Sequence, residues 1–450
     1  MNAPTTAKST AGPKIRTKLP GPNAQRVLDE DARLISPSYT RGYPLVVKSG
    51  RGVVIEDMDG NEFFDFAAGI AVCSTGHCHP EVVAAIQKQA GELMHMSGTD
   101  FYYPQMTELA DRLSKIAPMR GPHRVYYGNS GAEAVEAAFK LARYHTKRQY
   151  VIAFYGAFHG RTMGALSLTC SKAQQRRRFS PLVPGVVHVP YPNLYRRPAG
   201  TDADEYALQT ARYIEDTVFR GEVPPEECAA IIVEPFQGEG GYLPGPPIFM
   251  QELRRICDRH GILLVADEVQ CGMGRTGKWW AIQHTGVEPD MVCSAKGIAS
   301  GMPLSALITK AEIMDWVPGS HASTFGGNPV CIAASLATLN VLEREGVSNA
   351  EAVGKYIMGR LRDWPEKVPL VGDVRGYGLM IGIELVTDKK TKQPAAEQRD
   401  KVSDVAFSKG LLVLGAGPNS LRLCPPLVVT KEQAAIALDL LEESIREVAK

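Results

Sequence analysis

The sequence predicts an α/β fold: a large domain built on a mostly parallel sheet, completed by a smaller α+β domain. From about residue 124 onward, short apolar runs alternate with amphipathic helical patterns. The apolar runs are continuous, as expected for parallel strands that are buried on both faces. Near residue 331 the alternation gives way to a long helical pattern with a few strand-like runs. We therefore expect an N-terminal arm and part of the small domain at 1–70, the large domain at 71–330 and the rest of the small domain at 331–450.

The elements can be predicted in order along the chain. Residues 50–66 predict a hairpin, because apolar runs flank Asp59-Gly60-Asn61, three residues that tolerate positive φ. A helical pattern follows Pro80. In the large domain we expect strands at 124–128, 150–156, 229–235, 262–269 and 290–296. Helices are expected between them, for example at 132–145 and 249–261. In the small domain we expect a helix at 332–346, strands at 378–386 and 411–415, and a closing helix at 431–448.

Composition narrows the classes of function. The 450 residues include 50 Lys and Arg against 49 Asp and Glu, so charge gives no reason to expect nucleic acid or an anionic membrane as partner. No apolar stretch is long enough to span a bilayer. Nine scattered cysteines without a CxxC pair predict reduced thiols and a cytoplasmic location. The first 28 residues lack acids, as transit peptides do, but four prolines interrupt any amphipathic helix, so we expect a flexible or partner-draped arm.

Two predicted strands end in ionisable residues. In the run LLVADEV at 263–269, the apolar residues are followed by Asp267 and Glu268 side by side. A buried carboxylate costs free energy unless a positive group satisfies it, so Asp267 requires a cation. The run DMVCSAK ends at Lys296, whose pKa burial would lower. A neutral amine of this kind is a nucleophile that can form a Schiff base with an aldehyde.

One cofactor satisfies both groups. Pyridoxal 5′-phosphate (PLP) has an aldehyde for a lysine and a ring nitrogen for a carboxylate. The stretch GNSGAEAV could bind its phosphate, because Ser130, Gly131 and Ala132 begin a predicted helix with free N–H groups. Ligands of such sheets bind outside the carboxyl ends of the strands. The residues expected along that rim are Asn129, Ser130, Glu234, Asp267 and Lys296.

Longer motifs resemble those of the class III aminotransferases. This subgroup of the fold-type I PLP enzymes includes the 4-aminobutyrate, ornithine and acetylornithine aminotransferases. The resemblance runs from about residue 20 to the C-terminus, and the shared order of its motifs makes chance implausible. The motifs are DFAAGIAV with GHCHP, NSGAEAVEAAFKLAR, YGAFHGRTMGALS, VEPFQGEGG, LLVADEVQCGMGRTGKWWA, SAKGIASGMPLSA, STFGGNPV and LRLCPPL.

The resemblance implies a set of residues that bind PLP. Lys296 would form the Schiff base and move the proton between substrate and cofactor, and Asp267 would keep the ring nitrogen protonated. Thr324 would reach the phosphate of a neighbouring subunit, which implies a homodimer or larger homo-oligomer with shared active sites. The remaining contacts would be Phe158 and Val269 on the ring faces, Gln270 and Glu234 near its phenolic edge, and Ser130, Gly131 and Ala132 at the phosphate.

The resemblance also implies a substrate site. Glu239 and Arg422 match a switch pair in which the glutamate covers the arginine while an ω-amine is bound. It then swings away, so that the arginine can bind the α-carboxylate of 2-oxoglutarate or glutamate. Arg161 would bind the distal carboxylate, and Ile70 matches an apolar residue of 4-aminobutyrate enzymes where ornithine enzymes have tyrosine. The implied reaction transfers the ω-amino group of 4-aminobutyrate to 2-oxoglutarate, giving an aldehyde and glutamate.

Other interpretations of the same residues stay open. Ornithine δ-transamination is one, and amino-acid racemisation is another, because similar archaeal proteins include racemases and nothing in the sequence shows which face receives the proton. A PLP-fold scaffold without catalysis is a third, against which Lys296 and Asp267 argue. His159 is expected to be a hydrogen-bonding residue and not a base. His77 and His79 have no third ligand at a useful spacing, so we expect no metal site.

Overall fold

A seven-stranded sheet forms the centre of the molecule, for which a computed structural model describes residues 12–450. Its order is β4-β12-β11-β10-β7-β5-β6. β10 runs parallel to β7 and β11, and β5 runs parallel to β6 and β7. Among the described strands of this sheet, β12 alone runs in the opposite direction, antiparallel to both β11 and β4. The strands are β4 (His123–Gly128), β5 (Tyr150–Phe154), β6 (Val186–Val189), β7 (Cys228–Val233), β10 (Leu263–Asp267), β11 (Met291–Ser294) and β12 (Ser305–Lys310). The predicted α/β class with a mostly parallel sheet is confirmed.

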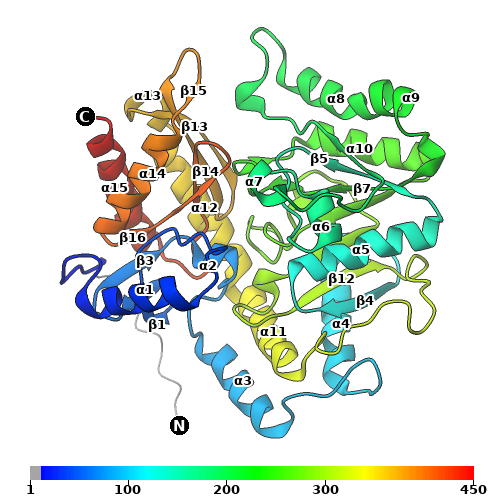
Figure 1. Cartoon of the computed structure of the whole chain (residues 1–450), viewed down its shortest axis with the longest axis horizontal. Coiled ribbons are helices and arrows are strands. Elements are labelled where there is room, and N and C mark those ends of the chain that lie inside the picture. Colours follow the sequence, from blue (N-terminus) through cyan, green and yellow to red (C-terminus); the bar gives the residue numbers. More distant parts are fainter. Residues whose placement is uncertain (1–11) are drawn as a thin grey trace.

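Helices cover both faces of this sheet. In β5, Val151 and Ala153 belong to the apolar cluster under α5 (Gly131–Thr146), whereas Phe154 belongs to the cluster that includes α10 (Pro247–His260). Side chains of a strand alternate between its two faces, so a strand buried on both must be apolar throughout. This is why the sequence shows continuous apolar runs, and Figure 1 shows helices on both sides of the sheet.

Helix α5 starts at the edge where the parallel strands end. Ser130 caps it, because the Ser130 Oγ accepts a hydrogen bond from the N–H of Glu133 at 3.3 Å. The alanine-rich sequence that follows favours a helix, and its alanines are buried against the sheet. The first turn of α5 therefore lies beside the carboxyl ends of β4 and the strands that run in the same direction, where ligands of such sheets bind.

Two smaller sheets lie apart from the central one (Figure 1). The first, β1-β2-β3-β16, contains the hairpin predicted at 50–66, with Gly60 at φ +83° in its turn. β16 pairs in parallel with β3, so the N-terminal and C-terminal parts of the chain share one sheet. The second has the order β13-β14-β18-β17. The strands are β1 (Val47–Arg51), β2 (Val54–Asp57), β3 (Glu62–Asp65), β13 (Val371–Tyr377), β14 (Met380–Asp388), β16 (Leu411–Leu412), β17 (Leu414–Ala416) and β18 (Ser420–Leu423).

The remaining elements connect these sheets and cover them. The longer helices are α1 (Pro22–Leu34), α3 (Pro80–Glu92), α4 (Pro104–Ile116), α8 (Ala203–Tyr213), α11 (Pro329–Val341), α12 (Val347–Leu361), α14 (Ala396–Ser408) and α15 (Lys431–Val448). Shorter elements near the site are α2 (Ala68–Ala71), α6 (Met163–Leu168), α7 (Ala173–Arg176), β8 (Phe236–Gln237) and β9 (Leu243–Pro244). The domain limits at residues 70 and 330 stay a prediction.

Three local predictions differ from the structure. The strand predicted at 411–415 is divided between two sheets, because β16 pairs with β3 and β17 pairs with β18. The helix predicted at 332–346 continues through a π-helical turn at Leu342–Gly346 into α12. Gly346 does not end it, since glycine in a helix interior costs only about 1 kcal/mol. The arm was expected to be flexible or draped over a partner; Lys14 instead pairs with Glu62 of the same chain and α1 begins at Pro22, whereas residues 1–11 lie outside the described ones.

Gly354 marks a tight crossing between α12 and the turn from β13 to β14. A Cβ on Gly354 would overlap the carbonyl group of Gly378, whereas a Cβ on Gly359 of the same helix would meet nothing within 4 Å. We predict that Gly354→Ala lowers the free energy of unfolding by about 1–3 kcal/mol, because the backbone must shift. The matched control, Gly359→Ala, should raise it by up to about 1 kcal/mol through helix propensity. Chemical denaturation measures both, and equal effects of the two substitutions would contradict the crossing.

Candidate active site

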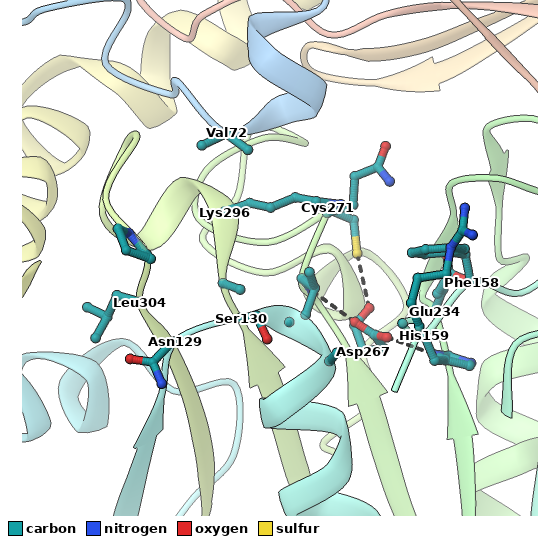
Figure 2. Close-up of a pocket in the computed structure, with 18 of the residues that line it drawn as sticks. Val72, Asn129, Ser130, Phe158, His159, Glu234, Asp267, Cys271, Lys296 and Leu304 are labelled. Carbon is teal, nitrogen blue, oxygen red and sulfur yellow. Dashed lines mark hydrogen bonds and ion pairs between the residues drawn. The ribbon is translucent and has the colours of Figure 1, made fainter. Parts of the chain in front are cut away.

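A cavity of about 460 Å³ opens at the carboxyl ends of the central strands. This volume lies in the range of small-molecule sites. The rim residues expected from the sequence, which follow four different strands, all line it; they are Asn129, Ser130, Glu234, Asp267 and Lys296. Figure 2 shows Lys296 extending across the cavity and Ser130 at the start of α5, with Asp267, Glu234 and His159 grouped on the other side.

Lys296 is the second residue after the end of β11 and begins a 3₁₀ turn that ends at Ile298. Its φ is +49°, a left-handed conformation that costs a residue with a side chain about 1 kcal/mol or more. Such strain often occurs where a side chain must be aimed at a ligand. Burial lowers the pKa of the Lys296 amine, and the positive charge of Arg422 lowers it further. A neutral amine in this position is a nucleophile.

Asp267 is held in place at the end of β10. One oxygen accepts the N–H of Val269 at 3.0 Å, and the other lies 2.6 Å from Nδ1 of His159. Both side chains are buried, with 3% of each residue exposed. Burial alone would lower the pKa of His159, but its hydrogen bond to Asp267 and the charge of that carboxylate raise the pKa overall. The result is a buried ion pair whose carboxylate is fixed toward the cavity that Asp267 lines.

The neighbouring carboxylate, Glu268, has a different role. Successive residues of a strand point to opposite faces, so Glu268 turns away from Asp267. Its oxygens accept the N–H groups of Ala281 and Ile282 at 2.9 and 2.8 Å, at the start of a 3₁₀ turn. Burial raises the pKa of Glu268 to about 7. Glu268 therefore supports the local fold and does not line the cavity.

The first turn of α5 can bind an anion. The N–H groups of Gly131 and Ala132 begin the helix, so they have no acceptor within it, and the helix dipole is positive at this end. A Cβ on Gly131 would come within 2.7 Å of Val269 Cγ1. Only glycine therefore lets the helix start this close to the end of β10. Both residues line the cavity, which suits a phosphate group there.

Glu234 positions two backbone segments beside the cavity. It accepts the N–H of Phe158 at 2.7 Å and the N–H of Gly238 at 2.6 Å. The sequence predicted only a contact with a cofactor ring, because bonds between segments far apart in the chain leave no local pattern. Phe158 lines the cavity, and the guanidinium carbon of Arg161 lies 5.5 Å from the centre of its ring. Gln270 also lines the cavity and accepts a hydrogen bond from the Tyr242 hydroxyl at 2.8 Å.

Glu239 and Arg422 form an ion pair outside the lining of the cavity. Nη1 of Arg422 donates to Oε1 of Glu239 at 2.8 Å, and Lys172 lies 3.2 Å from Oε2. Burial alone would raise the pKa of Glu239, but the charges of Arg422 and Lys172 lower it. Arg422 is buried, and its Nε has no hydrogen-bond partner among the described residues. The arginine therefore retains an unused donor for a further anionic group.

Ile70 and Thr324 lie away from this cavity. Ile70 is 43% exposed and lines a second cavity of about 360 Å³ with Gly69 and Leu412. Thr324 is exposed and lines neither cavity. Val72, two residues after Ile70, does line the first cavity, as do several residues that the sequence did not single out: Phe236, Cys271, Met302, Pro303 and Leu304. Met302, Pro303 and Leu304 belong to the run GMPL, and the closeness of this run to Lys296 in the sequence could have indicated that they line the cavity.

Within residues 12–450, no three His, Cys, Asp or Glu side chains are arranged as metal ligands. His77 instead lies 2.8 Å from Asp65. None of the helices described has the length and apolar character needed to cross a membrane.

The residues that line the cavity fit PLP. An amine at Lys296, a fixed carboxylate at Asp267 and the open N–H groups at the start of α5 surround one space. These are the partners that an aldehyde, a ring nitrogen and a phosphate require. Phe158 and Val269 supply apolar surface in the same cavity.

Comparison with known proteins relates this site to a family. The family model described as aminotransferase class-III matches residues 35–445. The chain is 42% identical to the alanine/serine racemase of Pyrococcus horikoshii, over 97% of this chain and 93% of that protein. It is 38% identical to the probable 4-aminobutyrate aminotransferase of Bacillus subtilis, over 92% and 96%. The fold matches the ω-transaminase of Pseudomonas jessenii in complex with PMP with a TM-score of 0.88 at 26% identity, covering 93% of this chain and 97% of that one.

The pairing of His159 with Asp267 leads to a prediction about cofactor retention. We predict that His159→Leu weakens PLP binding about tenfold or more, because it leaves a buried carboxylate without its cationic partner. Loss of PLP from the holoprotein during dialysis, followed by absorbance, measures this. His188→Leu is the matched control, since burial lowers the pKa of that histidine to about 4, and its ring contacts the Leu168 carbonyl and the Tyr155 ring but no carboxylate among the described residues. Equal retention of PLP by the two variants would contradict the pairing.

Proposed function

The chain belongs to the class III aminotransferases, which depend on PLP, and on this basis we propose that it transfers the ω-amino group of 4-aminobutyrate to 2-oxoglutarate. A similar ω-amino acid is included in the proposal. The products would be an aldehyde and glutamate. Membership of the family implies an amino donor and an oxo-acid acceptor, both small molecules.

The observation that carries this proposal is the ion pair between Glu239 and Arg422. The two substrates differ at the carbon that carries nitrogen: an ω-amine has no carboxylate there, whereas glutamate has one. A site that uses both must be able to cover and uncover a positive charge. The contact of 2.8 Å between Glu239 and Arg422 supplies the covered state, and the unpartnered Nε of Arg422 supplies a donor for the uncovered one. An arginine can then bind the α-carboxylate in a bidentate manner.

The cavity residues that the sequence singled out each have a proposed part in the reaction. PLP, when bound, supplies an aldehyde that takes up an amine and a ring that accepts an electron pair. Lys296 is proposed to bond to that aldehyde and to move the proton at the substrate carbon. Asp267, paired with His159, is proposed to keep a proton on the ring nitrogen. The remaining assignments are Phe158 and Val269 on the ring faces, Gln270 and Glu234 near its phenolic edge, Ser130, Gly131 and Ala132 at the phosphate, and Arg161 at the distal carboxylate.

We also propose a homodimer or larger homo-oligomer in which Thr324 reaches the phosphate site of the neighbouring subunit. In support, Thr324 is exposed and does not line its own cavity, and the adjacent Phe325 is 60% exposed. Tyr102 and Met94 are also exposed apolar side chains. A cytoplasmic location is proposed because all nine cysteines are free, as expected in a reducing compartment.

A direct test concerns Lys296. We predict that Lys296→Ala abolishes turnover, because no other amine lines the cavity among the described residues. Borohydride reduction of the parent holoenzyme should leave the mass of the cofactor on the peptide that contains Lys296. The variant should carry no such mass. A variant that keeps its activity, or a modified peptide elsewhere in the parent, would contradict the assignment.

The donor is tested by adding amines singly to the holoenzyme without an oxo acid. We predict that 4-aminobutyrate shifts the absorbance of the cofactor and that 2-oxoglutarate then restores it, with one glutamate formed per site. Ornithine is the matched comparison, because Ile70 stands where ornithine enzymes would have tyrosine. A response to ornithine alone would contradict the preference for 4-aminobutyrate. Absence of any response to ω-amines would contradict the proposed function as a whole.

Racemisation of amino acids is the second candidate. It is favoured by the 42% identity to the alanine/serine racemase over nearly the whole chain. A racemase uses the same lysine and cofactor but returns the proton to the opposite face of the substrate carbon. Loss of optical activity of an L-amino acid, without glutamate formation from any ω-amine, would support this candidate and exclude the first.

A further inference from the structure

Lys172 is a second cation in contact with Glu239, the residue whose carboxylate is proposed to cover and uncover Arg422. It lies at the N-terminus of the short helix α7, and its amine is 3.2 Å from Oε2 of Glu239. Arg422 occupies the other oxygen, Oε1, at 2.8 Å. The two contacts differ in exposure: the Lys172 side chain is 49% exposed, whereas that of Arg422 is only 7% exposed. Glu239 therefore bridges a buried cation and an exposed one.

The backbone around Glu239 is fixed, so the switch must be a movement of the side chain. Gly238 donates its N–H to Glu234 at 2.6 Å, and the carbonyl of Glu239 accepts the N–H of Gly417 at 2.8 Å. Arg375 donates to the carbonyls of Gly241 and Tyr242 at 2.7 and 2.9 Å. These bonds hold the loop at both ends. Rotation about the side-chain bonds of Glu239 is then the available way to uncover Arg422.

The two cations contribute differently to the two positions of Glu239. In the covered state, Arg422 and Lys172 both contact the carboxylate, so it has two cationic partners. Once a substrate carboxylate takes Arg422, Glu239 loses that partner, and a partly buried carboxylate without a cation costs free energy. Among the described residues, Lys172 is the other cation in contact with this carboxylate. Its long and half-exposed side chain can follow the carboxylate as it moves away from the cavity.

We propose that Lys172 is a positioning residue that holds Glu239 in its released position and so favours binding of α-carboxylate substrates. The inference rests on the proposed function, because it assigns a partner to the open state of that switch. It predicts a specific asymmetry. Lys172 should matter for 2-oxoglutarate and L-glutamate, which need Arg422 uncovered, and little for 4-aminobutyrate, which does not.

The test is steady-state kinetics of the holoenzyme in both half-reactions. Lys172→Met should raise KM for 2-oxoglutarate and L-glutamate about fivefold, as expected for loss of one partly exposed ion pair. Its kcat and its KM for 4-aminobutyrate should stay within about twofold. Lys172→Arg should restore most of the loss. Arg177→Met is the matched control, since it removes one exposed cation from the same segment without touching Glu239.

A double-mutant cycle separates this role from direct contact with substrate. If Lys172 acts through Glu239, then Lys172→Met should change KM for 2-oxoglutarate by less than about twofold in a Glu239→Gln background. A full effect in that background, or a higher KM for 4-aminobutyrate, would mean that Lys172 binds the substrate itself and would overturn the proposal. No change in either background would overturn it as well.

The outcome for the parent enzyme distinguishes the two proposals. A parent that forms glutamate from 4-aminobutyrate, but whose Lys172→Met variant behaves like the Arg177→Met control, contradicts the role of Lys172 alone. A parent that forms no glutamate from any ω-amine contradicts the proposed function, and the role of Lys172 fails with it.

Discussion

The buried ion pair between Asp267 and His159 is the interaction on which the site depends. A carboxylate this deeply buried is costly unless a cation and hydrogen bonds satisfy it. His159 supplies the charge at 2.6 Å, and the N–H of Val269 supplies a further bond. These two contacts hold the carboxylate in place beside the cavity. Lys296, whose pKa is lowered by burial and by Arg422, lies across the same space and can act as a neutral amine.

The parallel sheet brings these groups together. Asn129, Glu234, Asp267 and Lys296 each follow a different strand, and strands that run in the same direction end at one edge. The first turn of α5 starts at that edge too, so an amine, a carboxylate and an anion site surround one cavity. Glu268 shows how strict this geometry is. It is the residue after Asp267, but its side chain turns away from the cavity and accepts N–H groups at the start of a 3₁₀ turn.

The residues proposed to choose the substrate belong to separate parts of the chain. Glu239 lies in the loop between β8 and β9, Arg422 on β18 and Lys172 beside α7. The proposed cofactor site and the proposed substrate switch are thus built from different elements. Similar proteins include both a racemase and an aminotransferase, as expected if the cofactor site is common and the reaction depends on residues around it.

The sequence by itself determined the fold class and placed along one rim the residues that are proposed to bind the cofactor. It could do so because continuous apolar runs report burial on both faces, and because Asp267, Lys296 and the start of α5 each follow such a run directly. Tertiary structure decided what no local pattern records. Glu234 bonds to a backbone 76 residues away, and Lys172 reaches Glu239 across 67 residues. The division of residues 411–415 between two sheets likewise depends on which strands lie beside it, since the same apolar run satisfies either pairing.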